Sequence, residues 1–210
     1  MNRIVQVLEG RPVIAAVRHL PDLAPALESP VGIIFLLTGT IFNMPDAVAR
    51  ARQAGKLTFV HLDLIQGLSR DDYGVRYLAD NVAPDGIITT RNSLVASARG
   101  RGLLTVQRTF LLDSQSVASG IHLVNESKPD VLEVLPGIIP GEVQQIVRKI
   151  RVPLITGGLI RTRAQCSAAM RAGAAGVSTS CQELWTFTPM AGAVAGGKEV
   201  DLFKAHREVH

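Results

Sequence analysis

The sequence predicts a single α/β domain of the (β/α)8 barrel class. Short apolar segments alternate with amphipathic segments eight times along the 210 residues, and this alternation is typical of a parallel sheet with helical crossovers. The chain is 47% hydrophobic but only 4% aromatic, which fits buried strands rich in valine, isoleucine and leucine. No Gly-x-Gly-x-x-Gly sequence follows the first strand, which argues against an open dinucleotide-binding sheet.

The elements are expected in regular order. The predicted strands are Val13–Val17, Gly32–Leu37, Leu57–Leu64, Gly86–Thr90, Leu104–Leu112, Val131–Leu135, Pro153–Thr156 and Ala175–Ser178. The predicted helices are Leu23–Glu28, Pro45–Ala54, Asp71–Asn81, Ser93–Arg101, Ser114–Ser127, Gly141–Ile150 and Arg163–Ala172. Three helices are followed by a glycine suited to a left-handed C-cap, namely Gly55, Gly102 and Gly173.

The predicted domain spans residues 1–187, and residues 188–210 form a C-terminal tail that suggests no function. Its Gly- and Ala-rich part, 191–197, is typical of a flexible linker. No apolar run is long enough for a membrane span, no signal peptide is evident, and two cysteines are too few for a disulfide framework. We therefore expect a cytoplasmic protein that does not bind a membrane.

The charge permits a nucleic-acid partner without demanding one. The formal net charge is +4, and 17 arginines stand against 5 lysines; the planar guanidinium suits phosphate groups. If the protein binds RNA, it needs a basic surface outside the barrel mouth. Arginines at probable helix ends are candidates for that surface: Arg50, Arg52, Arg99, Arg101, Arg148 and Arg151.

Polar residues stand at strand ends where a buried parallel strand should be apolar. His61 and Asp63 are two residues apart in one predicted strand, so they share a face. Glu133 lies between apolar neighbours, and a buried carboxylate without a partner is costly. Of the adjacent Gln107 and Arg108, one should point inward. Because the carboxyl ends of parallel barrel strands meet at one mouth, these residues predict a ligand site there.

The last two strands predict a phosphate site. Gly157 and Gly158 follow the seventh strand, and Thr179 and Ser180 end the eighth. Loops in these positions commonly hold a phosphate in barrels of this class. Glycine lets a backbone N–H approach an anion closely, and residues 181–185 suit one helical turn. The mouth would then suit a small phosphorylated polyol or sugar, and His61, Asp63 and Glu133 could serve hydroxyl binding, acid–base chemistry or a divalent metal.

The chain closely resembles the glycerol uptake operon antiterminator regulatory proteins, also called glycerol-3-phosphate responsive antiterminators. The resemblance covers residues 10–185 and rests on segments at nearly every strand end. They include PVIAAV at 12–17, FVHLDLIQGL at 59–68, DGIITTR at 85–91, QRTFLLDS at 107–114, EVLPGIIP at 133–140 and GGLI at 157–160. Thr156 is a departure, since alanine is common before the glycine pair in this family.

The resemblance implies a barrel that senses glycerol 3-phosphate, binds an mRNA leader and lets transcription pass a terminator, regulating glycerol uptake and metabolism genes. Carried onto this chain, the phosphate would be held by Gly157, Gly158, Thr179 and Ser180. The glycerol hydroxyls would meet His61, Asp63 and Glu133, with Arg18 or Arg108 as counter-charge. A homodimer is possible, and we expect no catalytic residue, no resident metal and no cofactor beyond this effector.

The alternative is an enzyme on the same barrel that acts on a small phosphorylated polyol or a glycerophosphodiester, with or without a metal ion. The sequence lacks the His-Arg-Gly opening of glycerophosphodiesterases, and no lysine lies at a strand end for Schiff-base chemistry. RNA recognition has its own difficulty, because few aromatic side chains are free for base stacking. Shape and phosphate contacts would then carry recognition.

Overall fold

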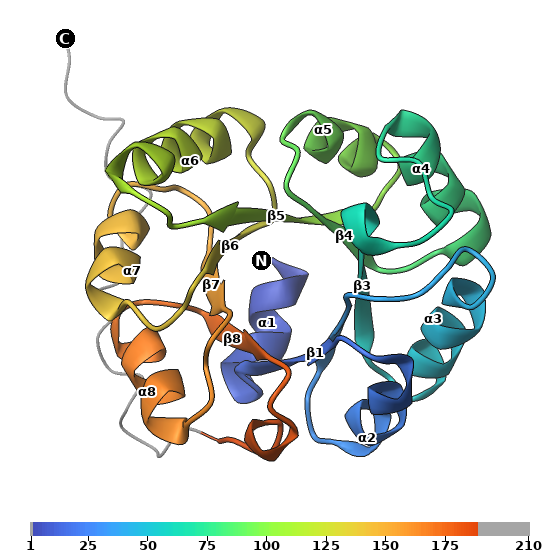
Figure 1. Ribbon diagram of the computed structural model, residues 1–210, viewed down its shortest axis with the longest axis horizontal. Coiled ribbons are helices and arrows are strands. Elements are labelled where there is room, and N and C mark those ends of the chain that lie inside the picture. The colour runs from blue at the N-terminus through green and yellow to red at the C-terminus, as the bar shows by residue number, and fades with distance from the viewer. Residues whose placement is uncertain (1, 189–210) are drawn as a thin grey trace, which may run out of the picture.

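The protein is a closed barrel of eight parallel strands surrounded by helices, as seen in a computed structural model that describes residues 2–188 (Figure 1). The strands are β1 (Val13–Val17), β2 (Ile33–Leu36), β3 (Leu57–His61), β4 (Gly86–Thr89), β5 (Leu104–Phe110), β6 (Val131–Leu135), β7 (Leu154–Gly157) and β8 (Gly176–Thr179). They pair in sequence order, and β8 pairs with β1 to close the sheet. The (β/α)8 class is therefore confirmed.

The helices form the outer layer. They are α1 (Arg3–Gly10), α2 (Leu23–Glu28), α3 (Met44–Gln53), α4 (Asp72–Tyr77), α5 (Ser93–Gly100), α6 (Ser114–Ser127), α7 (Pro140–Val147) and α8 (Arg163–Arg171). Short helical turns are η1 (Leu20–Asp22), η2 (Leu62–Leu64), η3 (Leu78–Val82) and η4 (Gln182–Leu184). None of the helices within residues 2–188 is long and apolar enough to cross a membrane.

The helix α1, which the sequence reading did not include, closes the amino-terminal end of the barrel. It lies in the middle of the ring in Figure 1. Its buried Ile4 and Leu8 pack with inward-facing strand residues such as Phe35 and Phe59, whose rings make an edge-to-face contact with centroids 5.7 Å apart. The apolar floor formed in this way leaves only the opposite end, at the carboxyl ends of the strands, open to a ligand.

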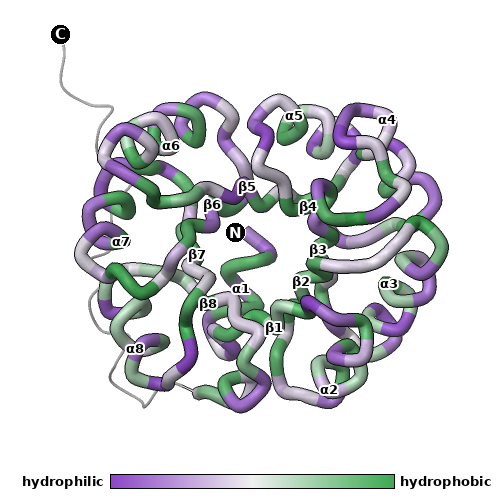
Figure 2. The backbone as a smooth tube through the Cα atoms, viewed as in Figure 1, coloured by the Kyte–Doolittle hydropathy of each residue, from purple (hydrophilic) through white to green (hydrophobic). Residues whose placement is uncertain are grey.

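A second apolar cluster lies between the strands and the outer helices, including Val17, Leu36, Val60 and Val134. Figure 2 shows the same division, with hydrophobic strands inside and polar residues on the outer faces of the helices. Alternate residues of each strand therefore serve the interior and the outer layer, as the two-residue period of a strand requires.

Local capping explains where several helices begin and end. The Asp71 carboxylate accepts hydrogen bonds from the N–H groups of Tyr73 and Gly74 and so caps the N-terminus of α4. Thr162 and Gln165 form a reciprocal capping box at α8. The three glycines expected as C-caps have positive φ angles, 69° at Gly55, 75° at Gly102 and 101° at Gly173.

Some predicted boundaries were wrong. The third strand ends at His61 rather than at Leu64, because the chain turns into η2. Asp63 therefore does not share a strand face with His61. The helix predicted at Asp71–Asn81 is α4 followed by the wider π-turn η3. The tail prediction falls almost entirely outside the described residues.

Candidate functional site

Strand alternation decides which polar residues face the barrel axis at the open end. Ile155 belongs to the interior cluster, so Gly157, two residues later, also faces inward. The same rule places Arg108 inward after Val106, which settles the ambiguity over strand five. Gln107 points to the outer layer, where its Oε1 accepts a 2.6 Å hydrogen bond from the Ser127 hydroxyl of α6.

A buried ion pair lies at the centre of the mouth. The Arg108 Nε donates to Glu133 Oε2 at 2.7 Å, and the two side chains are only 8% and 0% exposed. The other carboxylate oxygen, Oε1, accepts a 2.6 Å hydrogen bond from the Ser178 hydroxyl of β8. Arg108 therefore supplies the positive charge that the buried Glu133 carboxylate requires. Because Arg108 uses Nε for this contact, its terminal nitrogens remain for a ligand.

The Gly157 position leaves room for this carboxylate. A Cβ built on Gly157 would overlap the Ser178 hydroxyl and lie 2.9 Å from Glu133 Oε1. Any larger residue would displace the hydrogen-bonded pair. Gly157 therefore has a packing role beside the ion pair, and this role was not predicted from the sequence.

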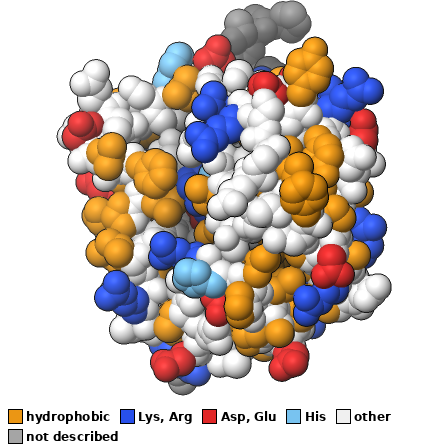
Figure 3. Space-filling view, turned by 45° about the vertical axis from the view of Figure 1, so that its right-hand side comes forward, with side chains coloured by type: hydrophobic (Ala, Val, Ile, Leu, Met, Phe, Trp, Pro, Cys, Tyr) orange, Lys and Arg blue, Asp and Glu red, His pale blue; other side chains and the backbone are white. Residues whose placement is uncertain are grey.

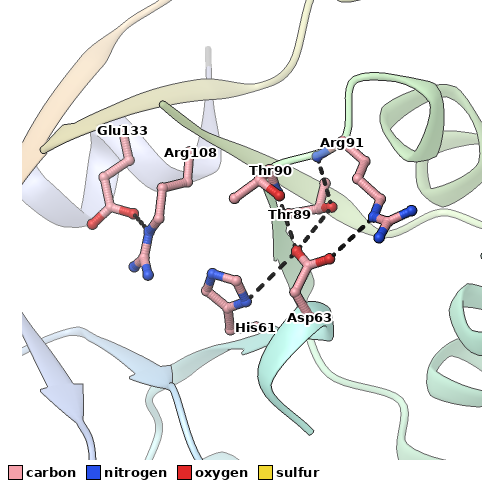
Figure 4. A network of polar contacts seen from close by, with 7 residues as sticks. All are labelled: His61, Asp63, Thr89, Thr90, Arg91, Arg108 and Glu133. Atoms are coloured by element: carbon pink, nitrogen blue, oxygen red, sulfur yellow. Dashed lines mark hydrogen bonds and ion pairs between the residues drawn. The ribbon is translucent and has the colours of Figure 1, made fainter. Parts of the chain in front are cut away.

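The His61 imidazole lies between the Arg108–Glu133 pair and Asp63, as Figure 4 shows. Its side chain is 4% exposed, and the buried Nδ1 has no hydrogen-bond partner among the described residues. The pKa of His61 is lowered to about 4, chiefly by burial and also by the nearby Arg108, while Asp63 partly opposes the change. At neutral pH the ring is uncharged, so it can donate one hydrogen bond and accept one.

This depressed pKa predicts a pH window for stability. The ordinary pKa of histidine is 6.5, so between pH 6.5 and 4 the unfolded chain binds a proton that the folded protein excludes. The free energy of unfolding should therefore fall as the pH drops from 7 to 4, by about 3 kcal/mol from this residue alone. Urea unfolding of wild type and His61→Gln at several pH values checks this. Identical pH dependence in the two proteins would contradict it, and the exposed His122→Gln is the control.

The Asp63 carboxylate is tied to the end of β4 (Figure 4). Its Oδ2 accepts from the Thr90 N–H at 3.2 Å and the Thr89 hydroxyl at 3.4 Å, and its Oδ1 lies 3.4 Å from Arg91 Nε. The separation of 3.8 Å from His61 Nδ1 is too long for a hydrogen bond. Asp63 therefore fixes the β4–α5 turn and holds Arg91 at the mouth. The turn residues Thr89, Thr90 and Arg91 were not among the predicted site residues.

The loops after β7 and β8 present backbone donors at the mouth. Gly158 and Leu159 have positive φ angles of 72° and 60°. Within residues 2–188, the Ser180 N–H makes no hydrogen bond to a backbone or side-chain acceptor, whereas the Gly158 N–H lies beside the β7–β8 ladder, whose last pair is Gly157 and Ser178. Backbone N–H groups in such a turn suit an anion.

The Thr179 hydroxyl faces away from the barrel axis. It donates to the Ile160 carbonyl at 2.9 Å and accepts from the Cys181 N–H at 3.1 Å. The Thr179 carbonyl in turn accepts from the Trp185 indole N–H at 2.9 Å. Thr179 therefore joins the two loops rather than offering its hydroxyl to the mouth. The inward-facing hydroxyl on β8 is that of Ser178. Because side chains alternate along a strand, counting back two residues from Ser180 would have identified it.

The side chains of Arg18 and Thr156 make no hydrogen bond or ion pair within the described residues. Arg18 is exposed directly after β1, at the same end of the barrel, and it makes no ion pair within the described residues. Thr156, the departure from the family pattern, is fully buried, and its hydroxyl has no partner among the described residues. Because Thr156 alternates with Gly157 along β7, its side chain lies in the outer layer and adds nothing to the mouth.

Large hydrophobic side chains surround the mouth. Phe42 is 88% exposed and Leu112 is 82% exposed, and both lie in loops that follow strands. Other exposed members of this group are Leu64, Phe110, Ile138, Ile139 and Leu159. Figure 3 shows one side of the molecule, where exposed hydrophobic side chains lie beside basic ones. The site thus consists of the buried polar side chains of His61, Arg108 and Glu133, surrounded by partly apolar loops.

The three candidate metal ligands do not come together. Within residues 2–188, no three His, Cys, Asp or Glu side chains are grouped closely enough to hold a metal ion. Both oxygens of Glu133 are used by Arg108 and Ser178, and Asp63 is directed to the β4–α5 turn. The donor arrangement therefore fits hydrogen bonding to a polar ligand better than a metal site.

Comparison with known proteins identifies the family. A family model described as glycerol-3-phosphate responsive antiterminator matches residues 13–185, which is most of the chain. The chain belongs to this family. An uncharacterised Escherichia coli K12 protein, YgcP, is 35% identical to this antiterminator-family protein over 183 residues, covering 87% of this chain and 96% of the relative.

Two solved structures resemble this member of the antiterminator family. A glycerol uptake operon antiterminator regulatory protein from Listeria monocytogenes matches with a TM-score of 0.80 and 35% identity, covering 83% of this chain and 95% of the other. A glycerol uptake operon antiterminator-related protein from Thermotoga maritima matches with a TM-score of 0.74 and 28% identity, covering 85% and 99%. The family expectation from the sequence is therefore confirmed.

Proposed function

We propose that this protein senses glycerol 3-phosphate at the barrel mouth and, with the effector bound, binds a leader mRNA so that transcription passes a terminator. The regulated genes would be those of glycerol uptake and metabolism. The observation that carries the proposal is the mouth itself. Among the described residues, a buried Arg108–Glu133 pair and a buried His61 nitrogen without a partner lie beside loops that include the unbonded Ser180 N–H, in a member of an antiterminator family.

The two halves of the effector match two halves of the mouth. We assign the phosphate to the β7 and β8 loops, where Gly158 and Leu159 have positive φ angles and the Ser180 N–H lacks an acceptor among the described residues. Gly157 lets the β7 loop lie close to Glu133 and Ser178, and Thr179 joins the β7 and β8 loops through its hydrogen bond to Ile160. Arg18 is an exposed cation at the same end. Charge-assisted hydrogen bonds of this kind give phosphate sites much of their affinity.

The glycerol hydroxyls would meet the buried polar side chains of the mouth. We assign them to the neutral His61 and to the terminal nitrogens of Arg108, which Glu133 holds in place, with Asp63 acting at the edge of the mouth through its contact with Arg91. A hydroxyl both donates and accepts, so it can satisfy the His61 Nδ1 that is left without a partner. The ion pair would orient these groups rather than react, and the proposed activity is recognition without conversion of the ligand.

Calorimetric titration with glycerol 3-phosphate tests the site. Gly158→Asp should lower affinity at least tenfold, because it places a carboxylate beside the phosphate at a position with φ of 72°. Gly141→Asp is the matched control, since nothing lies within 4 Å of that position in the first turn of α7 and a carboxylate there is favourable. Equal affinity in the two variants would contradict the phosphate assignment.

The recovered ligand decides between sensor and enzyme. After titration, with and without Mg²⁺, the glycerol 3-phosphate should be chemically unchanged. Effector-dependent binding of a leader transcript from the organism's glycerol-uptake genes is then the second requirement. Turnover of the ligand would replace the sensor by an enzyme, and absence of binding would remove glycerol 3-phosphate as the effector.

A further inference from the structure

Exposed cations gather at the end of the barrel opposite to the mouth, where the helices return to the strands. We use the name basic strip for six exposed residues at the ends of α5 to α8: Arg99, Lys128, Arg148, Lys149, Arg151 and Arg171. The same helix ends carry only two carboxylates, Glu126 and Asp130. Asp130 is engaged, because it accepts hydrogen bonds from the N–H and the hydroxyl of Thr105.

Contacts between successive helix ends make the basic strip continuous. The Arg99 Nη1 donates to the Lys128 carbonyl at 3.1 Å, which joins α5 to α6. The Asn125 Nδ2 donates to the Lys149 carbonyl at 3.1 Å, which joins α6 to the α7–β7 loop. At the next junction, a Cβ built on Gly173 would lie 3.2 Å from Val147 Cγ1, so the end of α8 packs on the end of α7.

The strip cations are also not neutralised. Within residues 2–188, none of the six forms an ion pair with a carboxylate, whereas Arg3, Arg50, Arg76 and Arg101 each do. Arg52 donates to the Ala83 carbonyl. Of the arginines that the sequence nominated for a basic surface, only Arg99, Arg148 and Arg151 therefore belong to the strip, and they are joined by cations that it did not name.

The mouth offers no comparable surface. Its loops and helix starts combine cations and carboxylates, namely Arg18, Arg70, Arg91, Arg161 and Arg163 with Asp22, Asp46, Asp63, Asp71, Asp72, Asp113, Glu142 and Glu183. The most exposed hydrophobic side chains also lie at that end, and none belongs to the basic strip. A surface with cations and no exposed aromatic ring suits the phosphate backbone of a base-paired stem, because single-stranded RNA is usually held by stacking on aromatic side chains.

We propose that the basic strip binds the phosphate backbone of a base-paired RNA stem, at the barrel end opposite to the effector mouth. This inference rests on the proposed function and gives its RNA a location. Effector and RNA then bind at the same time without competing for one surface. The α7–β7 and α8–β8 loops of the strip lead directly into β7 and β8, whose other ends carry the proposed phosphate loops, so the same two strands connect the sites.

Charge reversal in the strip is the test. Lys149→Glu and Arg171→Glu should each weaken binding of the leader transcript at least tenfold in saturating glycerol 3-phosphate, measured by fluorescence anisotropy. The slope of log K against log salt should become less steep by about 1 for each cation lost. The affinity for glycerol 3-phosphate should stay within twofold of wild type. Arg70→Glu, an exposed residue of the β3–α4 loop with the same charge change, is the control and should bind RNA as wild type does.

The outcomes separate the two proposals. If the wild-type protein with effector does not bind the leader, the RNA part of the proposed function fails, and this inference fails with it. If wild type binds and the strip variants bind equally well, or if Arg70→Glu alone loses binding, only the location is overturned. Circular dichroism and urea unfolding of each variant ensure that a loss of RNA binding reflects the surface and not the fold.

Discussion

Replacing Arg108 by methionine should destabilise the protein by about 3–5 kcal/mol, which is the range for a buried ion pair that loses one partner. Glu133 is 0% exposed and accepts its 2.7 Å hydrogen bond from Arg108 Nε. In the variant its carboxylate keeps only the Ser178 hydroxyl, so it remains buried with one oxygen unsatisfied. Urea unfolding at pH 7 measures the loss.

A second variant distinguishes charge imbalance from lost packing. Arg108→Met combined with Glu133→Gln removes both charges and keeps an amide that can bond to Ser178, so most of the stability should return. Arg50→Met is the surface control; its pair with Asp46 spans 3.8 Å between exposed side chains, and its loss should cost less than about 1 kcal/mol. A single Arg108→Met as mild as the control would show that Glu133 finds another partner.

Gly157→Ala should have the next largest effect, destabilising the protein by about 1–3 kcal/mol through overpacking. The added Cβ overlaps the Ser178 hydroxyl and approaches Glu133 Oε1 to 2.9 Å. Since the Glu133 carboxylate would have to move, we also expect the affinity for glycerol 3-phosphate to fall at least tenfold. Thermal unfolding and calorimetric titration measure the two effects.

Removal of the clashing hydroxyl should reverse part of this loss. Gly157→Ala with Ser178→Ala relieves the closest contact, so the double variant should be more stable than the sum of the two single changes predicts. Gly100→Ala, at the end of α5 with nothing within 4 Å, should be neutral or slightly stabilising. Strict additivity at residues 157 and 178 would mean that the strand moves aside to admit the methyl group.

Local pattern was sufficient for the strands and for several residues of the candidate site. The apolar runs that precede Gly157 and Ser180 identified the last two strands, and counting them placed the loops at the mouth. The isolated carboxylate of Glu133 indicated a polar contact in the interior. Strand ends were less certain, because a helical turn such as η2 after His61 continues the same apolar pattern. The plug α1 was missed, since its buried positions Ile4 and Leu8 have no meaning until the barrel closes around them.

The sequence by itself determined the barrel class, its family and the residues that could meet at the mouth, because each strand carries its own two-residue period and its own polar end. Only the tertiary structure decided which side chains pair with each other at the mouth. Arg108 stands beside Glu133 through the register of β5 on β6, 25 residues apart, and Ser178 reaches the same carboxylate across 45 residues. Register in a closed barrel is fixed jointly by all eight strands, so no single segment contains it.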